Sequence, residues 1–183
     1  MPEAIRLRGA RIVDPAAGRD EVGDVGVAEG RIVPPDQLPA GALELDCDGL
    51  VLAPGLVDPH THLRQPGGED AETVETGCRA AALGGYTAVA PMANTDPVAD
   101  NAAVIHEVLD LGAAAGLCDV FPVGAVTRGL GGEQLAELGE MVEAGVRVFS
   151  DDGRAVPSPQ VLRNALTYLL AFGEVVVAEG PGH

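Results

Sequence analysis

Two histidines separated by one residue, His60 and His62, are the clearest chemical signal in the sequence. They follow a short apolar run at 56–59 that is typical of a β-strand. Side chains alternate along a strand, so both imidazoles are expected on one face, with Asp58 and Arg64 beside them. Neutral imidazole is a good ligand for zinc and other transition metals. The spacing alone is more typical of a pair of hydrogen-bonded histidines. Together with the preceding Asp58, the following Arg64 and the position where a strand passes into a loop, it predicts a metal site.

From residue 53 onward, short apolar runs alternate with amphipathic segments. Strands are expected at 56–59, 86–90, 120–124, 146–149 and 174–178, which start at intervals of 26 to 34 residues. One helix is expected in each interval, with Asp100 as N-cap of the second and with Ser158 and Pro159 beginning the fourth. Such repeats predict a parallel sheet, either doubly wound or a barrel. In a barrel, chemistry lies at the carboxyl ends of the strands, where His60 and His62 fall.

Residues 1–52 follow a different pattern. Short strands are expected at 5–7, 11–13, 25–27, 31–33 and 43–46, separated by turns rich in Gly, Pro and Asp. The stretch 24–33 is typical of a hairpin in which Gly30 adopts a positive φ. The sequence therefore predicts two parts, a small all-β segment at 1–52 and a strand–helix repeat at 53–183.

Composition limits the classes of partner. The 183 residues include 28 acidic and 11 basic side chains, all of them arginine, for a net charge of −17. Nucleic acids and anionic membranes attract clustered cations, so neither is an expected partner. Cys47, Cys78 and Cys118 lack the spacing of a zinc ribbon or a disulfide framework. Free thiols, with no visible signal peptide or membrane-spanning run, predict a cytoplasmic protein.

Three strings resemble the dihydroorotases of the amidohydrolase superfamily, in particular the long-form bacterial type. They are GLVDPHTHLRQPG at 55–67, PMANTDP at 91–97 and FSDDG at 149–153, and each falls at the end of an expected strand. The resemblance spans residues 1–178. It implies an α/β fold, a partial TIM (β/α) barrel of about five strands preceded by a small β-sandwich segment. The implied activity is the reversible interconversion of dihydroorotate and N-carbamoyl-L-aspartate in pyrimidine biosynthesis.

The resemblance also implies roles for individual residues. His60, His62 and Asp152 match metal ligands, and Asp152 matches the carboxylate that touches or bridges two metals. Arg64 and Asn94, with His62, match residues that bind the substrate, whose carboxylate suits a guanidinium fork. The implied cofactor is zinc, as one or two ions, which assists hydrolysis of the cyclic amide.

The absence of lysine bears on the bridging ligand. Many superfamily members bridge their metals with a carboxylated lysine on the fourth strand, which this chain cannot supply. Asp151 or Asp152 is the available oxygen ligand; the motif favours Asp152, whereas spacing alone does not separate the two. A bare Asp-Asp-Gly is otherwise typical of a polar turn. For residues 127–130, which follow the third strand, a solvated loop is expected in preference to a place at the mouth of the site. His106 is expected to lie at the surface, and Arg154 has no role that its spacing assigns.

The match to the family ends at residue 178. The family has a ligand histidine after its fifth strand, another on its sixth and a proton-shuttling aspartate, the general base, on its eighth. Here the fifth strand is followed by EGPGH, and His183 is not assigned the ligand role. This loss of motif is typical of a truncated or frameshifted fragment, and 53–183 is about half of the ~250 residues of a whole barrel. The chain alone is expected to be inactive and poorly stable, or to depend on a partner.

Two other interpretations stay open. One is a hydantoinase, dihydropyrimidinase or allantoinase, against which the missing lysine and the His62-Leu63-Arg64 string argue. The other is a non-catalytic scaffold for aspartate transcarbamoylase, against which retention of the five site residues named above argues. The expected partners are a small-molecule substrate and, in addition, a second copy of the chain or a transcarbamoylase.

Overall fold

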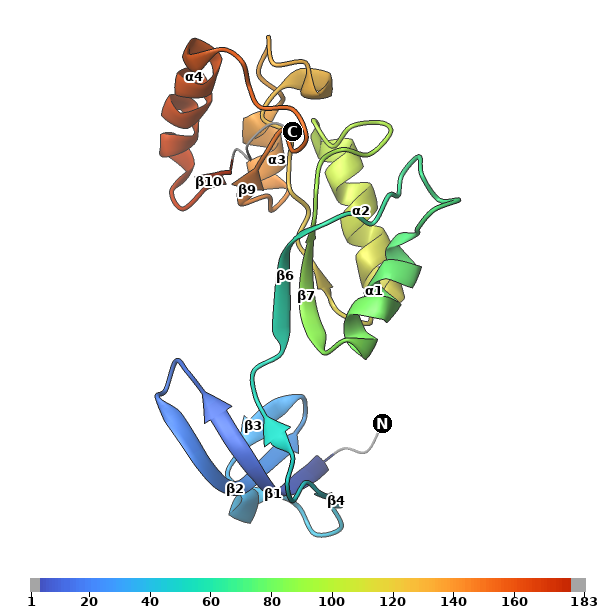
Figure 1. The fold of residues 1–183 in the computed structure, drawn as a ribbon, viewed down its shortest axis with the longest axis vertical. Coiled ribbons are helices and arrows are strands. Elements are labelled where there is room, and N and C mark those ends of the chain that lie inside the picture. Colours follow the sequence, from blue (N-terminus) through green and yellow to red (C-terminus); the bar gives the residue numbers. More distant parts are fainter. Residues whose placement is uncertain (1–3, 179–183) are drawn as a thin grey trace. The chain divides into compact units, whose positions relative to one another are not determined.

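The computed structural model describes residues 4–178 and divides into two units, Met1–Pro54 and Gly55–His183, which are described separately. The first unit contains β1 (Ala4–Asp14), β2 (Arg19–Ala28), β3 (Arg31–Val33), the short 3-10 helix η1 (Pro35–Gln37), β4 (Leu43–Asp46) and β5 (Val51–Leu52) (Figure 1). The strand order is β3-β2-β1-β4, and β5 also pairs with β1. β1 runs antiparallel to β2 and parallel to β4 and β5.

The strands expected separately at 5–7 and 11–13 are one strand, β1. Its register against β2 shifts between Leu7 and Ala10, and an irregularity of this kind bends a strand without ending it. The expected hairpin is confirmed, because β2 and β3 pair antiparallel and both Glu29 and Gly30 in the turn have positive φ. Across residues 4–54 the structure describes one sheet, so a β-sandwich stays a prediction.

The second unit repeats strand and helix, and the mixed α/β fold is confirmed. Its elements are β6 (Leu56–Thr61), α1 (Val74–Leu83), β7 (Tyr86–Pro91), α2 (Ala102–Ala115), β8 (Asp119–Val120), η2 (Arg128–Leu130), α3 (Leu138–Glu143), β9 (Val148–Phe149), α4 (Pro159–Leu169), η3 (Leu170–Phe172) and β10 (Val176–Val177). β6, β7 and β8 form one parallel sheet, and β9 and β10 form another. A parallel bridge between Gly124 and Phe149 links the two sets in chain order.

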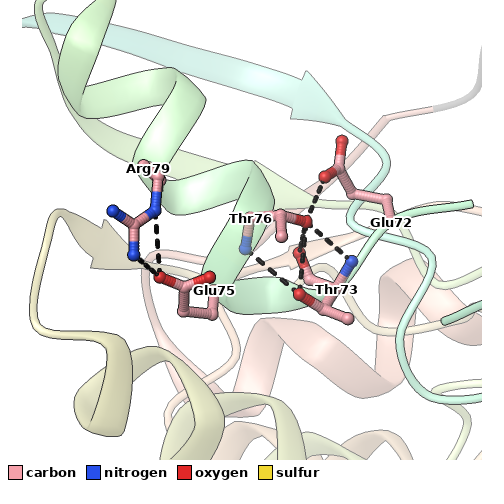
Figure 2. A network of polar contacts seen from close by, with 5 residues as sticks. All are labelled: Glu72, Thr73, Glu75, Thr76 and Arg79. Carbon is pink, nitrogen blue, oxygen red and sulfur yellow. Dashed lines mark hydrogen bonds and ion pairs between the residues drawn. The ribbon is translucent and has the colours of Figure 1, made fainter.

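Local sequence explains where α1 begins. The Thr73 hydroxyl accepts a hydrogen bond from the Thr76 backbone N–H at 3.1 Å, and the Thr76 hydroxyl accepts one from the Thr73 backbone N–H at 3.0 Å. Figure 2 shows this reciprocal pair, with Glu72 accepting from the Thr76 hydroxyl and Arg79 donating to Glu75. The pair satisfies two amide groups that the first helical turn leaves without partners, so the helix begins directly after Thr73.

The N-cap expected for α2 is wrong by one residue. The side chain of Asn101, not that of Asp100, accepts hydrogen bonds from the backbone N–H groups of Ala103 and Val104 in the first turn. Asp100 instead accepts from the Gly129 backbone N–H at 2.8 Å and so binds the loop that follows β8. The start expected for α4 is confirmed, with Ser158 as N-cap and Pro159 in the first turn.

Two apolar clusters stabilise the second unit. One lies among α1, β7, α2 and β8 and includes Val74, Cys78 and Val108. The other packs α2, α3 and α4 around Phe149 of β9. Burial of such side chains is the main favourable term in folding. Within residues 4–178, none of the helices has the length and apolar character needed to cross a membrane.

Candidate metal centre

The carboxyl end of β6 brings His60 and His62 to Asp152, which follows β9. His60 Nε2 lies 3.2 Å from Asp152 Oδ1, and His62 Nε2 lies 3.6 Å from Asp152 Oδ2. One donor atom from each of the three residues lies within 4.8 Å of the other two. We call these three residues the His60–His62–Asp152 cluster. It joins the ends of strands that are some ninety positions apart in the chain.

The cluster fits a metal ion by its donor types and spacing. Two imidazole nitrogens and a carboxylate oxygen are a donor set that zinc accepts. With metal–ligand bonds of about 2.0–2.2 Å, two ligands of a tetrahedral ion lie about 3.3–3.6 Å apart. The observed separations of 3.2 and 3.6 Å are close to this value. The ligand roles stay predictions, and the geometry is compatible with them.

Asn94, in the loop after β7, contacts both sides of the cluster. Its Oδ1 lies 3.0 Å from His62 Nδ1, and its Nδ2 donates to Asp152 Oδ2 at 3.3 Å. An amide oxygen can only accept, so this contact requires a proton on Nδ1. In the neutral form of the ring, which is the form that binds metals, the Nε2 lone pair of His62 is then directed to the Asp152 side, where a metal ion would bind.

The two adjacent aspartates, left undistinguished by spacing, have different surroundings. Asp152 lies with the histidines, whereas Asp151 is 2% exposed and faces the protein interior. Asp151 Oδ1 accepts from the backbone N–H groups of Val126 and Thr127 at 2.8 and 3.0 Å, and Oδ2 accepts from the Thr127 hydroxyl. Its acceptor capacity is used within the fold, which leaves Asp152 as the carboxylate for the cluster.

The strand alternation of β6 does not extend to Arg64. β6 ends at Thr61, and Arg64 has a left-handed φ of 60° that breaks the extended pattern. Its side chain is exposed and makes no hydrogen bond or ion pair with the rest of residues 4–178. Asp58 remains near, because its Oδ1 accepts from the His60 backbone N–H at 3.1 Å. His106 is exposed on α2, as expected, and His183 lies outside the described residues.

The expectation of a solvated loop at 127–130 is confirmed for Arg128 and Gly129, which are exposed, and is wrong for Thr127 and Leu130. Thr127 is fully buried and Leu130 nearly so, because this segment is bonded to Asp151 and packs into the core. A pocket of about 340 Å³ lies against it, lined by residues that include Asn94, Gly129, Asp152 and Arg154. The Asp151–Thr127 contact spans 24 positions, and nothing in the spacing of either residue predicts it.

Comparison with known proteins identifies the sequence family. The dihydro-orotase-like family profile matches residues 49–180. A dihydroorotase of Leifsonia xyli is 60% identical over 139 residues, which are 75% of this chain and 32% of that protein. A dihydroorotase of Geobacter sulfurreducens is 47% identical over 175 residues, 94% of this chain and 41% of that protein. The chain thus spans about a third to two fifths of the length of these relatives.

Solved structures are similar in fold. An L-hydantoinase (dihydropyrimidinase) from Arthrobacter aurescens superposes with a TM-score of 0.75 at 22% identity, over 97% of this chain and 40% of that one. A D-hydantoinase from Bacillus sp. AR9 gives a TM-score of 0.65 at 24% identity, over 97% and 40% of the two chains. At these identities the likeness concerns the fold alone. The family profile covers well over half of the sequence, and the chain belongs to the dihydro-orotase-like family.

Proposed function

We propose that this chain contributes to a metal-dependent cyclic amidohydrolase that interconverts dihydroorotate and N-carbamoyl-L-aspartate in pyrimidine biosynthesis. The observation that carries the proposal is the convergence of His60, His62 and Asp152 at the carboxyl ends of two strands. Family membership supports the choice of substrate, because the relatives at 47 and 60% identity carry the name dihydroorotase. Metal-assisted hydrolysis is the reaction class that suits such a donor set.

His60, His62 and Asp152 are the proposed ligands, and zinc, as one or two ions, is the proposed metal. When bound, the metal supplies a Lewis acid for the amide carbonyl and lowers the pKa of water. Asn94 holds the His62 ring so that Nδ1 keeps its proton and Nε2 binds, as outer hydrogen bonds do in metal sites. Asp152 supplies the oxygen ligand in a chain that has no lysine.

Arg64, Asn94 and His62 are the proposed substrate-binding residues. The Arg64 guanidinium is exposed and unpaired among residues 4–178, so its fork of donors is available to a carboxylate. The Asn94 amide lies in the wall of the 340 Å³ pocket beside Asp152, where a small cyclic substrate would be oriented. Together these residues would hold the ring so that its amide faces the cluster.

We assign residues 1–52 to a small β-sandwich and 53–183 to part of a (β/α) barrel, in keeping with the fold likeness to hydantoinases. A polypeptide of these 183 residues alone is expected to turn over negligibly, because residues 4–178 supply three candidate ligands and no identified general base. The free thiols of Cys47, Cys78 and Cys118 support the cytoplasm as the location. Self-association, or association with aspartate transcarbamoylase, belongs to the same proposal.

The proposal is tested on the intact protein by elemental analysis and a substrate panel. We expect bound zinc, and hydrolysis of dihydroorotate in preference to hydantoin, dihydrouracil and allantoin. His60→Ala and Asp152→Asn should each lower kcat/KM by about a hundredfold or more, because a lost ligand removes several kcal/mol of charge stabilisation. His106→Ala is the matched control, because His106 is exposed on α2 and should leave both zinc content and rate unchanged.

The outcomes separate the candidates. Full zinc content and an unchanged rate in His60→Ala and Asp152→Asn would refute the cluster as the metal centre. A preference for hydantoin would favour the hydantoinase alternative. Metal-free protein that co-purifies with a transcarbamoylase would favour the scaffold alternative, which retention of all five site residues argues against.

A further inference from the structure

The Asp151 carboxylate is a buried charged group that the proposed reaction does not use. It is 2% exposed and accepts three hydrogen bonds, all from Val126 and Thr127. A charge removed from water is tolerated only when it is well bonded, and here each oxygen has at least one donor. Through these hydrogen bonds, Asp151 links the end of β9 to the segment that follows β8.

Two further hydrogen bonds hold the segment that Asp151 contacts, residues 127–132. The Thr127 hydroxyl, which donates to Asp151, also accepts from the Gly132 backbone N–H at 2.9 Å. Asp100 accepts from the Gly129 backbone N–H at 2.8 Å. Residues 127–132 thus form a closed turn, and Gly129 within it lines the 340 Å³ pocket that Asp152 also lines.

Asp152 directly follows Asp151 in the chain. On one side of the aspartates, the Ser150 backbone N–H donates to the Gly124 carbonyl at 2.9 Å. On the other, the Arg154 backbone N–H donates to the Asp151 backbone carbonyl at 2.8 Å. The backbone that carries Asp152 is held on both sides, and the inward carboxylate of Asp151 keeps the neighbouring side chain on the opposite face. These hydrogen bonds thus restrict where the Asp152 oxygens can lie.

We propose that Asp151 and Thr127 form a positioning pair that holds the Asp152 carboxylate in register with His60 and His62. This inference rests on the proposed function, and it deepens it by naming residues that support the centre without binding the metal. Neither Asp151 nor Thr127 is a catalytic residue. Groups that orient a ligand in this way typically change metal affinity by about 10- to 100-fold when they are lost.

The test compares variants of the intact protein by zinc affinity, measured in competition with a chromophoric chelator, and by the visible spectrum of the cobalt-substituted form. Asp151→Asn removes the charge at constant size, and Thr127→Val removes the hydroxyl at nearly constant shape. Both should weaken zinc binding about tenfold or more and alter the cobalt spectrum. Thr127→Ser restores the hydroxyl and should bring the affinity back to within about twofold of the parent.

Leu169→Ala is the control for a merely structural role, because Leu169 is buried in the same unit but lies on α4. It should lower the unfolding temperature of the metal-free protein while zinc affinity and the cobalt spectrum stay unchanged. The positioning role is overturned if Asp151→Asn and Thr127→Val affect zinc affinity no more than Leu169→Ala does. If Asp151→Asn does not fold, the Thr127→Val and Thr127→Ser pair decides the question.

Asp152→Ala separates this inference from the proposed function. Unaltered zinc binding in Asp152→Ala would contradict the metal centre itself. Loss of zinc in Asp152→Ala together with parental affinity in Thr127→Val would contradict the positioning pair alone.

Discussion

Asp151 and Asp152 show how much the position of a single residue decides. They are identical side chains on neighbouring residues, yet one is buried with three donors and the other faces two imidazoles. One step along the chain thus changes the environment from the interior to the cluster. At this scale, chemical role follows from surroundings more than from residue type.

The Cys78 thiol provides a prediction at the residue scale. Burial on α1 and the hydrogen bond with Cys118 raise its pKa from 9.0 to about 12. The folded state therefore holds this proton more tightly than the unfolded state does, and the contribution to stability is complete below pH 9 and is lost as pH rises toward 12. The unfolding temperature, measured by circular dichroism, should fall across that range.

Cys78→Ala should flatten this alkaline decline, because it removes the group whose proton is held. Cys47→Ala is the matched control; Cys47 belongs to the first unit and is partly exposed, so its removal should leave the decline in place. Equal slopes in the parent and in Cys78→Ala would contradict the assignment to Cys78.

Close contacts at glycine determine how the elements of the second unit meet. Short strands such as β8 and β9 gain few hydrogen bonds of their own, so their approach depends on the packing around them. At Gly124, a Cβ atom would lie 2.9 Å from the Phe149 ring and 3.0 Å from the Met141 sulfur. The absence of a side chain there lets the segment after β8 lie against β9, and the Asp151–Thr127 contact is formed at this junction.

Gly124→Ala tests this packing at the element scale. The added methyl group overfills a packed site, and overpacking typically costs about 1–3 kcal/mol of unfolding free energy. Urea denaturation of the intact protein should show that loss. Gly84→Ala is the control, because its nearest neighbours would lie at 3.4 Å, an ordinary contact, and the expected change is below about 0.5 kcal/mol. Equal effects of the two substitutions would count against the close contact.

At the scale of the whole molecule, the main feature is the apolar surface that each unit exposes to water. In the second unit, Val57 is 61%, Phe121 59% and Val176 57% exposed. In the first, an apolar pocket of about 250 Å³ is lined by residues that include Leu7 and Val25. Exposed apolar surface of this kind favours association, and the curated relatives are more than twice as long as this chain.

A polypeptide of these 183 residues should therefore self-associate. Light scattering after size exclusion is expected to show oligomers or aggregates, and a hydrophobic dye should bind strongly. Phe121→Ser should reduce dye binding, whereas Glu107→Ser, an exposed polar change on α2, should not. A monodisperse monomer with a cooperative thermal transition and no dye binding would contradict this expectation.

The sequence by itself determined the repeating strands and helices of the second unit, the hairpin around Gly30, the start of α4 at Ser158 and the spacing of His60 and His62. These features depend on periodicity, turn residues and caps, which are local in the chain. The sequence placed the N-cap of α2 one residue too early and divided β1 into two strands. Neighbouring residues can each serve as a cap, and a register irregularity within a strand resembles a turn in the sequence.

Only the tertiary structure decided which aspartate joins the cluster, that Thr127 is buried and that Asn94 contacts both His62 and Asp152. Those contacts join residues 24 to 92 positions apart. They form where the ends of parallel strands meet, so no local pattern specifies them. The sequence therefore determined which residue types are available for chemistry, and packing decided which of them face one another, because direction in space is set by neighbours distant in the chain.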